Sequence, residues 1–559
     1  MQSYIDSLTK GLSRGTLNKQ ISNIKEFFKK TKHNREYTAK DVALLRSQFL
    51  TDPNWTAMAG SYKMRQKLND MPLKNKSCFR ALGALNPTQA RAMMEAHIES
   101  DAPALDGIYL SGWQEASSGE NTYGNMFPDQ SLYPVNSVPE KIKKINQVLQ
   151  AADRIKQSQL NNKSTSKDMI KTLESIDYQS PIIADIEAGF GQEIHTFQLA
   201  FECIKAGAAC LHLEDQDGSL KKCGHMGGKV KVSIQQYITK LKAVRLAADV
   251  LGVDTVIIAR TDARGTKLIN NISDARDRQF CIKVITKAYL LSPSAAEVDL
   301  NTPAIWKKLV ASLLIETYNC NGQNHHRLTQ KCEQIVLTSM QNEVSFKKSI
   351  QSIKKATNVS VEQAKELLHI FNKCEYLSTA DGYYRFDAGL QAAIEVGLAA
   401  AEYSDLIWFE TSDPDIDEAK AFAKAIHAKY PKKAFHYNCS PSFNWAKHFK
   451  TKYGKDWKTK LENFSTDLAK LGFKSQKITL FGMHAVNQGI KDRVIAYQKR
   501  HMKGYSELQE DERKSGNRSF EHQSFVGVDV WSSITECCAG EGSELVATFG
   551  DSATMDQFH

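Results

Sequence analysis

Several acidic side chains directly follow short apolar runs in the middle of the chain. Asp185 and Glu187 follow one run, Glu214 follows the next, and Asp129 lies in an earlier loop behind a proline. Carboxylates gathered at one place repel one another unless a cation lies among them. All of these ligands would be oxygens, which favours a hard ion, Mg²⁺ or Mn²⁺ in its place. A salt-bridged strand end explains any one of these acids, whereas four at equivalent positions favour a metal site.

Residues 221–229 could carry a proton-transfer residue. They read Lys-Lys-Cys-Gly-His-Met-Gly-Gly-Lys, so that Cys223 lies among basic side chains and three glycines. Glycines allow such a loop to fold over a ligand, and the neighbouring cations with His225 favour a thiolate at Cys223. Most cysteines in a chain that contains 11 are buried structural thiols, but this loop is polar and cationic. We therefore expect Cys223 to exchange a proton near neutral pH.

Other polar residues could bind the carboxylate groups of a small substrate. Arg260 can hold a carboxylate through two hydrogen bonds, and an ion pair with Asp262 is the plain alternative. Residues 438–442 read Asn-Cys-Ser-Pro-Ser and offer neutral donors on a proline-stiffened turn, or an ordinary β-turn with a helix cap. The further polar or small residues that close apolar runs are Ser111, Gly112, Trp113, Glu410 and Thr479.

The apolar runs themselves predict a barrel. Short runs, each closed by polar or glycine-rich residues, recur at residues 78–84, 107–112, 181–186, 209–215, 255–262, 405–411, 434–440 and 477–482. With helical patterns between them, these eight runs match an α/β fold of the TIM type, a closed (β/α)8 barrel. Functional side chains of such a barrel lie at the C-terminal ends of the strands, so the residues above should meet at one mouth. A doubly wound open sheet is disfavoured because no Gly-x-Gly-x-x-Gly follows an early strand.

The spacing of the runs also predicts the organisation of the chain. Residues 1–75 form an N-terminal helical extension, 76–265 and 376–490 form the two parts of the barrel, and 491–559 form a C-terminal helical segment and tail. Residues 266–375 lack a convincing strand and predict a helical insertion after the fifth strand. Helical patterns within it cover residues 305–318, 328–354 and 361–371.

Composition and charge exclude several classes of protein. The chain of 559 residues is 42% hydrophobic and 24% charged, which is typical of a globular protein. No run reaches the roughly 20 apolar residues of a membrane span, and no secretory signal begins the chain, although its Lys- and Ser-rich start leaves a transit peptide open. The net charge of +10 is spread along helices, which argues against nucleic acid as a partner. An odd number of irregularly spaced cysteines favours reduced thiols, and we expect a cytoplasmic protein.

The segments that carry chemistry resemble the isocitrate lyase family, within the isocitrate lyase and phosphoenolpyruvate mutase superfamily. The most specific are Lys-Lys-Cys-Gly-His at 221–225 and Asn-Cys-Ser-Pro-Ser-Phe-Asn-Trp at 438–445, and weaker ones run from about residue 82 to the closing Gln-Phe-His. The resemblance implies Mg²⁺-dependent cleavage of isocitrate to succinate and glyoxylate, the first committed step of the glyoxylate bypass. It also implies a homotetramer whose C-terminal helices exchange between neighbours, and a Cys-bearing loop and tail that close over the substrate.

The resemblance further implies a role for each matching residue. The residues on the glyoxylate portion would be Ser111, Gly112, Trp113 and Arg260. Asp185 would bind Mg²⁺, and the residues that hold metal-bound waters would be Asp129, Glu187 and Glu214. The succinate portion would meet Gly224, His225, Asn438, Ser440, Ser442 and Thr479. Cys223 would protonate the succinate-side carbanion, and Tyr109, a metal-bound water or a carboxylate would take the hydroxyl proton.

Some positions depart from the family pattern and keep other functions open. Leu213 stands where isocitrate lyases commonly carry Trp or Phe, which leaves room for a methyl group on the substrate. Lys231 and Ser233 replace an apolar residue and a proline, and residues 378–385 lack the usual Arg and Glu. One alternative is therefore a 2-methylisocitrate lyase or a related acid lyase. Another is a non-catalytic helical interaction protein that uses the barrel as a scaffold.

Overall fold

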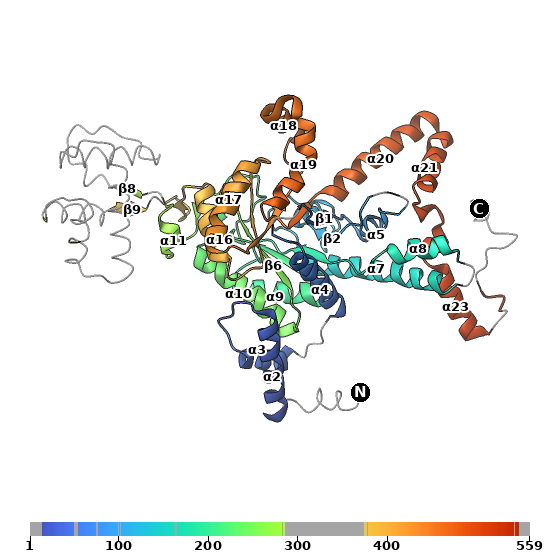
Figure 1. Cartoon of the computed structure of the whole chain (residues 1–559), viewed down its shortest axis with the longest axis horizontal. Coiled ribbons are helices and arrows are strands. Elements are labelled where there is room, and N and C mark those ends of the chain that lie inside the picture. Colours follow the sequence, from blue (N-terminus) through green and yellow to red (C-terminus); the bar gives the residue numbers. More distant parts are fainter. Residues whose placement is uncertain are drawn as a thin grey trace.

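Eight parallel strands close into a barrel in the computed structural model (Figure 1). In barrel order they are β1 (Phe79–Gly83), β13 (Ser475–Ile478), β12 (Ala434–Asn438), β11 (Leu406–Phe409), β6 (Val256–Thr261), β4 (Cys210–Glu214), β3 (Ile182–Asp185) and β2 (Gly107–Leu110). The barrel closes because β1 pairs on one side with β2, Ala81 opposite Gly107, and on the other with β13, Phe79 opposite Ser475. The predicted TIM-type barrel is confirmed, and the open sheet is excluded.

The structure describes residues 14–49, 54–73, 76–98, 100, 102–162, 165–281, 283–285, 351, 361, 374–376, 378–540 and 543–546. The predicted helices at 305–318, 328–354 and 361–371 lie outside these residues, apart from positions 351 and 361. The proposed domain boundaries therefore stay predictions. Among the described helices, none combines the length and the apolar character that crossing a membrane requires.

Short strands frame the predicted insertion. β8 (Lys283–Ile285) pairs with β9 (Cys374–Tyr376) as an antiparallel ribbon, and β7 (Leu268–Ile269) lies between β5 (Val230–Lys231) and β10 (Tyr384–Arg385). The prediction that residues 266–375 contain no strand is thus wrong at β7, β8 and β9. Strands of two or three residues are too short to leave an alternating pattern in the sequence.

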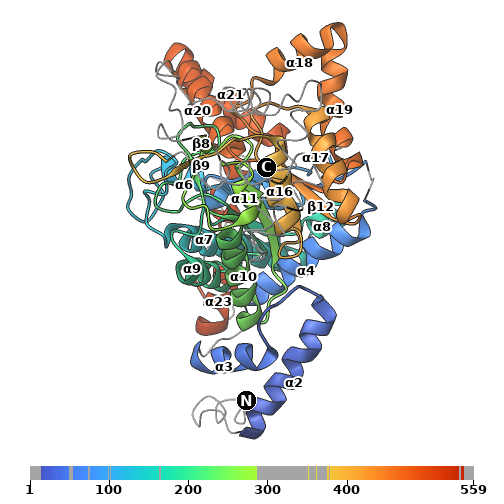
Figure 2. The same cartoon turned by 90° about the vertical axis from the view of Figure 1, so that its left-hand side faces the viewer.

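Helices surround the barrel and extend it at both ends (Figures 1 and 2). The barrel helices are α5 (Pro87–Glu95), α6 (Gly112–Ser117), α7 (Ser137–Asn161), α8 (Lys167–Ser175), α9 (Glu193–Lys205), α10 (Ile234–Leu251), α11 (Ala275–Arg278), α16 (Leu390–Ala400), α17 (Ile416–Lys429), α18 (Trp445–Tyr453) and α19 (Trp457–Lys470). At the N-terminal side lie α2 (Arg14–Thr31), α3 (Ala39–Phe49) and α4 (Trp55–Asp70). The C-terminal helices are α20 (Phe481–Arg500), α21 (Met502–Lys514), α22 (His522–Phe525) and α23 (Val528–Ala539).

Apolar side chains form an outer core between the strands and the helices and a smaller core inside the barrel. The outer core joins Leu211 and Leu213 of β4 to Leu241 and Val244 of α10. The inner core runs down to α4, whose Met64 packs with barrel residues. Strands that are buried on both faces read as continuous apolar runs, which is why they were visible in the sequence.

Two departures from the family pattern have local explanations next to β5. The Lys231 ammonium is buried and pairs with Asp277 of α11 at 2.6 Å, and its Nζ also donates to the Val232 carbonyl. Ser233 caps α10, because its hydroxyl accepts the Gln236 N–H. The Lys231–Asp277 ion pair joins the start of the predicted insertion to the barrel. The Ser233 cap begins α10 in place of the proline that is usual at this position.

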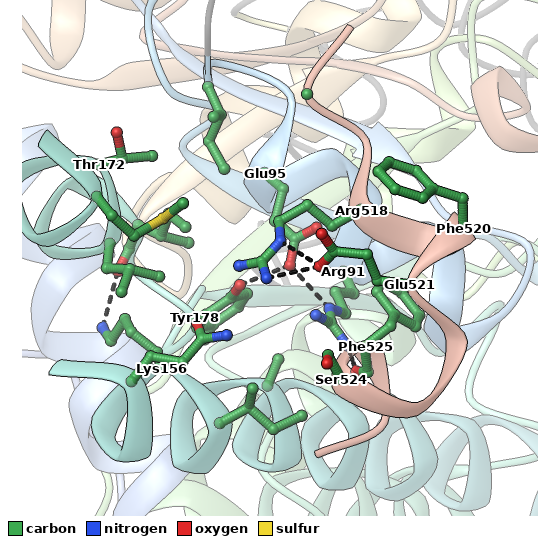
Figure 3. A pocket seen from close by; sticks show the side chains of 18 of the residues that line it. Arg91, Glu95, Lys156, Thr172, Tyr178, Arg518, Phe520, Glu521, Ser524 and Phe525 are labelled. Atoms are coloured by element: carbon green, nitrogen blue, oxygen red, sulfur yellow. Dashed lines mark hydrogen bonds and ion pairs between the residues drawn. The ribbon is translucent and has the colours of Figure 1, made fainter. Parts of the chain in front are cut away.

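The C-terminal segment docks on α5, α7 and α8 around a cavity of about 380 Å³ (Figure 3). Arg91 stacks on the Phe525 ring at 3.6 Å and donates to the Phe525 carbonyl at 2.6 Å. It also pairs with Glu95, which accepts a hydrogen bond from Tyr178. Because the Arg91 and Glu95 charges are already paired with one another, we interpret this cavity as an anchor for the C-terminal helices.

A partly buried ionic network lies at the opposite end of the barrel from the strand C-termini. Asp405, which precedes β11, pairs with Arg65 of α4 and Arg245 of α10 at 2.9 Å each and accepts the Ile257 N–H at 2.8 Å. Although burial opposes it, the two guanidinium groups hold the pKa of Asp405 well below its usual range. The network joins the N-terminal extension to the barrel.

We expect Asp405→Asn to lower the free energy of unfolding by about 2–3 kcal/mol, because it removes this counter-charge from the buried Arg245 and the partly buried Arg65. Since the folded pKa is depressed, this stabilisation is fully present above the unfolded value of about 3.9 and is lost as the pH falls below it. Urea titrations at neutral pH measure the loss. Asp177→Asn, which removes an exposed pair with Lys63, is the control and should change the value by less than about 1 kcal/mol. Equal effects of the two variants would contradict the argument.

Candidate active site

A cavity lies at the C-terminal ends of the strands, where barrel enzymes carry their active sites. It is lined by Tyr109, Ser111, Trp113, Asp129, Asp185, Lys221, Cys223, Gly224, His225, Arg260, Trp408, Glu410, Asn438, Ser440, Pro441, Ser442, Thr479 and Leu480. Almost every residue that the sequence singled out is in this set. The three that are not in it, Gly112, Glu187 and Glu214, each contact a residue of the lining, Asp185 or Arg260.

Asp185 ends β3 and is held from three sides. Its Oδ2 accepts hydrogen bonds from the Tyr109 hydroxyl and the Gly112 N–H at 3.1 Å each, and its Oδ1 accepts the Glu187 N–H at 2.9 Å. A side chain at Gly112 would come within 2.3 Å of Glu187 Oε1, so only glycine fits there. Glu187 itself has a positive φ of 54°, a strained conformation for a residue with a side chain. The backbone is thus bent to bring these two carboxylates together.

Lys221 lies among the predicted metal ligands. Its ammonium pairs with both Asp129 and Glu187, and it is buried. Although burial opposes it, these two carboxylates, with Glu214 nearby, raise the pKa of Lys221 well above its usual range. Within the described residues, no group of three or more His, Cys, Asp or Glu side chains is already arranged to hold a metal ion. Lys221 was not predicted, and its position two residues before Cys223 was the available signal.

Two of the acids are buried without enough positive charge. Burial raises the pKa of Glu187 to about 8, with Lys221 acting in the opposite direction. Burial also raises the pKa of Glu214 well above its usual range, with Arg260 opposing it. Neither Glu214 oxygen makes a hydrogen bond, and Arg260 Nη1 lies 3.1 Å from Oε2 as an ion pair. These carboxylate oxygens fit a hard divalent cation, which would stabilise their ionised forms.

The thiol of Cys223 is partly exposed to the cavity and remains protonated. Burial, and next the charge of Asp129, raise its pKa to about 12, against the lowering effects of a backbone hydrogen bond, Arg260 and Lys221. The prediction of a thiolate is therefore wrong. Its basic neighbours do not act on the sulfur alone, because Lys221 pairs with acids and Lys229 pairs with Asp262 at 3.0 Å. The protonated thiol is suited to donate a proton.

The loop that carries Cys223 contacts the turn after β12. His225 Nε2 and Ser440 Oγ lie 2.9 Å apart, and the Ser442 N–H donates to the same hydroxyl oxygen at 3.1 Å. The Asn438 Oδ1 atom is buried without a hydrogen bond beside them. A side chain at Gly224 would meet Arg260 Nη2 at 2.6 Å, so the loop can approach Arg260 only with glycine there. Neutral donors and acceptors thus face the thiol across the cavity.

Arg260 forms the predicted ion pair with Asp262 and is also placed to bind a substrate carboxylate. Its Nε pairs with Asp262 at 3.1 Å, as the plain alternative predicted, and its Nη2 lies 3.4 Å from Glu410. Its guanidinium also stacks on the Trp408 ring at 4.4 Å, and it still lines the cavity. The acids orient the guanidinium and leave it at the cavity wall. Trp408 was not predicted, because an aromatic residue inside an apolar strand resembles ordinary core.

Some residues near the mouth have structural roles. Asp215 accepts hydrogen bonds from Thr261 Oγ1 at 2.7 Å and from the Asp262 N–H at 2.9 Å, and it is buried. Leu213 belongs to the outer core with α10 and does not line the cavity. The expectation that Leu213 leaves room for a methyl group on the substrate is therefore wrong. Side chains of a strand alternate, so a residue between His212 and Glu214 points away from the barrel interior.

Comparisons with known proteins agree with this geometry. Residues 20–558 match the isocitrate lyase family. The chain is 35% identical over 522 residues to the isocitrate lyase of Escherichia coli K12, which covers 92% of this chain and 93% of that one. It is 34% identical to the isocitrate lyase of Halalkalibacterium halodurans, covering 92% of each chain, and 32% identical to isocitrate lyase 1 of Mycobacterium tuberculosis, covering 94% of each.

Among solved structures, the chain is similar to 2,3-dimethylmalate lyase, with a TM-score of 0.43 and 14% identity, covering 89% of this chain and 100% of that one. It is also similar to oxaloacetate acetylhydrolase, with a TM-score of 0.42 and 13% identity, covering 88% and 100%. The family match over residues 20–558, together with relatives above 30% identity over most of their length, shows that this chain belongs to the isocitrate lyase family.

Proposed function

We propose that the chain is an isocitrate lyase that cleaves isocitrate to succinate and glyoxylate with the help of Mg²⁺. One observation carries the proposal: a protonated thiol, Cys223, lines a cavity together with Arg260 and Lys221, and these two cations contact the buried acids Glu214 and Glu187. Family membership supports the same reaction. The products place the chain at the entry to the glyoxylate bypass, beside the tricarboxylic acid cycle.

Carboxylate oxygens at the mouth supply the metal-binding residues. Asp185 would hold Mg²⁺ directly, and Asp129, Glu187 and Glu214 would hold it through water. When bound, the ion supplies Lewis acidity at the substrate hydroxyl and its neighbouring carboxylate. Lys221 already provides one positive charge between Asp129 and Glu187, which supports the need for cations at this place.

Three groups could take the hydroxyl proton, and the structure favours a carboxylate. Burial raises the pKa of Tyr109 well above its usual range, so its hydroxyl stays protonated and donates to Asp185. Burial raises the pKa of Glu187 to about 8, so this carboxyl group could accept a proton once a nearby cation has ionised it. Tyr109 therefore orients Asp185, and a carboxylate of this set accepts the proton.

Polar groups on the other wall act on the succinate half. Ser111, Gly112, Trp113 and Arg260 would bind the glyoxylate portion. Glu410 keeps Arg260 oriented, and the succinate carboxylates would meet Gly224, His225, Asn438, Ser440, Ser442 and Thr479. Cleavage leaves an electron pair on the succinate side, and the Cys223 thiol donates its proton to that carbon.

The loop around Cys223 must move to admit substrate. The cavity has room for about 50 Å³, enough for a few water molecules and too little for a tricarboxylic acid. Gly227 and Gly228 lie near the end of the loop, and Gly228 has a positive φ of 75°. We propose that residues 221–229 open and close over the substrate.

We further propose a cytoplasmic homotetramer that assembles through its C-terminal helices. Large apolar side chains are exposed there on α20 and α23: Ile490, Val494, Tyr497, Trp531 and Ile534. Several large apolar side chains exposed on one helix are typical of a protein contact. Neither a membrane nor nucleic acid is proposed as a partner.

A paired assay tests the proposed reaction. The purified chain with Mg²⁺ is given isocitrate or 2-methylisocitrate, and the release of glyoxylate or pyruvate is measured. We expect glyoxylate from isocitrate at a kcat/KM at least about tenfold above that for pyruvate release. Preferential pyruvate release would assign a 2-methylisocitrate lyase instead, and no turnover with either substrate would support the scaffold alternative.

A further inference from the structure

The barrel interior beneath the cavity is unusually polar. The cores of such barrels are normally filled by branched apolar side chains. Here the inward residues below the cavity include His212 of β4, His436 of β12 and Lys477 of β13, all buried. One nitrogen of each, His212 Nε2, His436 Nε2 and Lys477 Nζ, makes no hydrogen bond. Buried polar atoms without partners are costly, so their presence calls for a functional reason.

Lys477 occupies the slot between two aromatic rings of the cavity floor. It is 1% exposed, and its Nζ lies 3.6 Å from the centre of the Tyr109 ring and 3.9 Å from the centre of the Trp408 ring. Both rings line the cavity, whereas Lys477 does not. The amine therefore lies behind the floor, where the faces of both rings attract its N–H groups.

Each of these rings supports a residue of the proposed reaction. The Tyr109 hydroxyl donates to Asp185, and the Trp408 ring stacks on Arg260 at 4.4 Å. A shift of either ring would thus move the residue proposed for Mg²⁺ or the residue proposed for glyoxylate. One buried amine holds both rings.

We propose that Lys477 is a positioning residue of the lyase: its amine fixes Tyr109 and Trp408, and through them Asp185 and Arg260. This inference rests on the proposed isocitrate lyase activity. An apolar side chain of the same length would fill the slot but would not hold the two ring faces around one point. Activity and stability should therefore separate at this residue.

The surroundings of Lys477 support the expectation that this residue lowers stability while it serves activity. Burial lowers its pKa well below the usual range, and Arg260 acts in the same direction, while Asp185 and Glu410 oppose them. Keeping this amine inside the barrel therefore destabilises the folded protein. A residue retained at such a cost is expected to serve activity.

Steady-state kinetics of Lys477→Met, which replaces the amine by an apolar side chain of similar length, test the inference. We expect kcat with isocitrate to fall about 10- to 100-fold, because small shifts of catalytic groups have effects of this size. The KM should change less than kcat, since Lys477 does not itself line the cavity and acts on the substrate only through Arg260 and Asp185. The melting temperature should stay equal or rise. Lys477→Gln, which keeps an N–H donor for the rings, should recover part of the lost kcat.

Lys474→Met is the matched control. Lys474 precedes the same strand, and its Nζ donates to the Leu68 and Met71 carbonyls, away from the cavity. It should leave kcat unchanged. A kcat of Lys477→Met equal to that of the wild type, or a loss of kcat that only follows a lower melting temperature, would overturn the positioning role and leave the proposed function intact. If the wild type itself releases no glyoxylate, the proposed function fails and this inference falls with it.

Discussion

Cys223→Ser is expected to lower kcat with isocitrate by about 10²- to 10⁴-fold, the usual contribution of a positioned proton donor. The hydroxyl is a far weaker acid than the thiol and holds its proton too tightly to deliver it at the same rate. The KM should change little, because the proton is transferred after the substrate binds. Steady-state release of glyoxylate measures both constants.

The pH dependence gives an independent check on Cys223. Because burial raises the pKa of its thiol to about 12, the acid form is present below that pH. No loss of kcat between pH 7 and pH 9 should therefore come from this residue. Alkylation by iodoacetamide at pH 8 should be slow, since only the thiolate reacts. Rapid alkylation of Cys223, or a Cys223→Ser variant with unchanged kcat, would remove it from the mechanism.

The exposed cysteines provide the control for general effects of thiol removal. Cys537 and Cys538 lie in α23 and are exposed. The double variant Cys537→Ser with Cys538→Ser should keep the kcat of the wild type. Any rapid iodoacetamide reaction at these two positions, the exposed ones among the cysteines that the structure describes, should disappear with it.

Removal of divalent metal by EDTA is expected to reduce turnover at least about 10³-fold, and excess Mg²⁺ should restore it. Burial raises the pKa of both Glu187 and Glu214, so a bound divalent cation would favour their ionised forms. Asp185→Asn should weaken the affinity for Mn²⁺, measured by calorimetry, at least about tenfold.

The same metal affinity should depend on pH in a known direction. Metal binding requires ionised carboxylates, so protons compete with the ion below the raised pKa of Glu187, about 8. The Mn²⁺ affinity should therefore rise between pH 6.5 and pH 8.5 and level off above it. Asp381→Asn, at an exposed position, is the control and should leave the affinity unchanged. An affinity that does not change over this pH range would show that the buried acids do not take part.

Much of the architecture could be predicted from the chain because its signals are local. Parallel strands buried on both faces read as apolar runs, and the polar residues that close them mark the mouth of the barrel. β13 shows the limit of this signal. It begins at Ser475, two residues before the predicted run, because Ser475, Gln476 and Lys477 are polar residues inside a barrel strand.

The error at Leu213 could have been avoided from sequence alone. If His212 and Glu214 face the interior, the residue between them faces the helices, and the structure indeed packs Leu213 against α10. The short strands β7 and β8 could not be predicted, because their pairing with β10 and β9 joins segments far apart in the chain.

By itself the sequence determined the (β/α)8 barrel, the family and most of the residues at its mouth, because these depend on residue types at given spacings. Only the tertiary structure decided their charge states and neighbours. Cys223 is a thiol rather than a thiolate, Lys221 lies between Asp129 and Glu187, and Lys477 lies under the cavity floor. The reason is that a pKa and an ion pair depend on burial and on charges brought from distant segments, which no local pattern in the chain records.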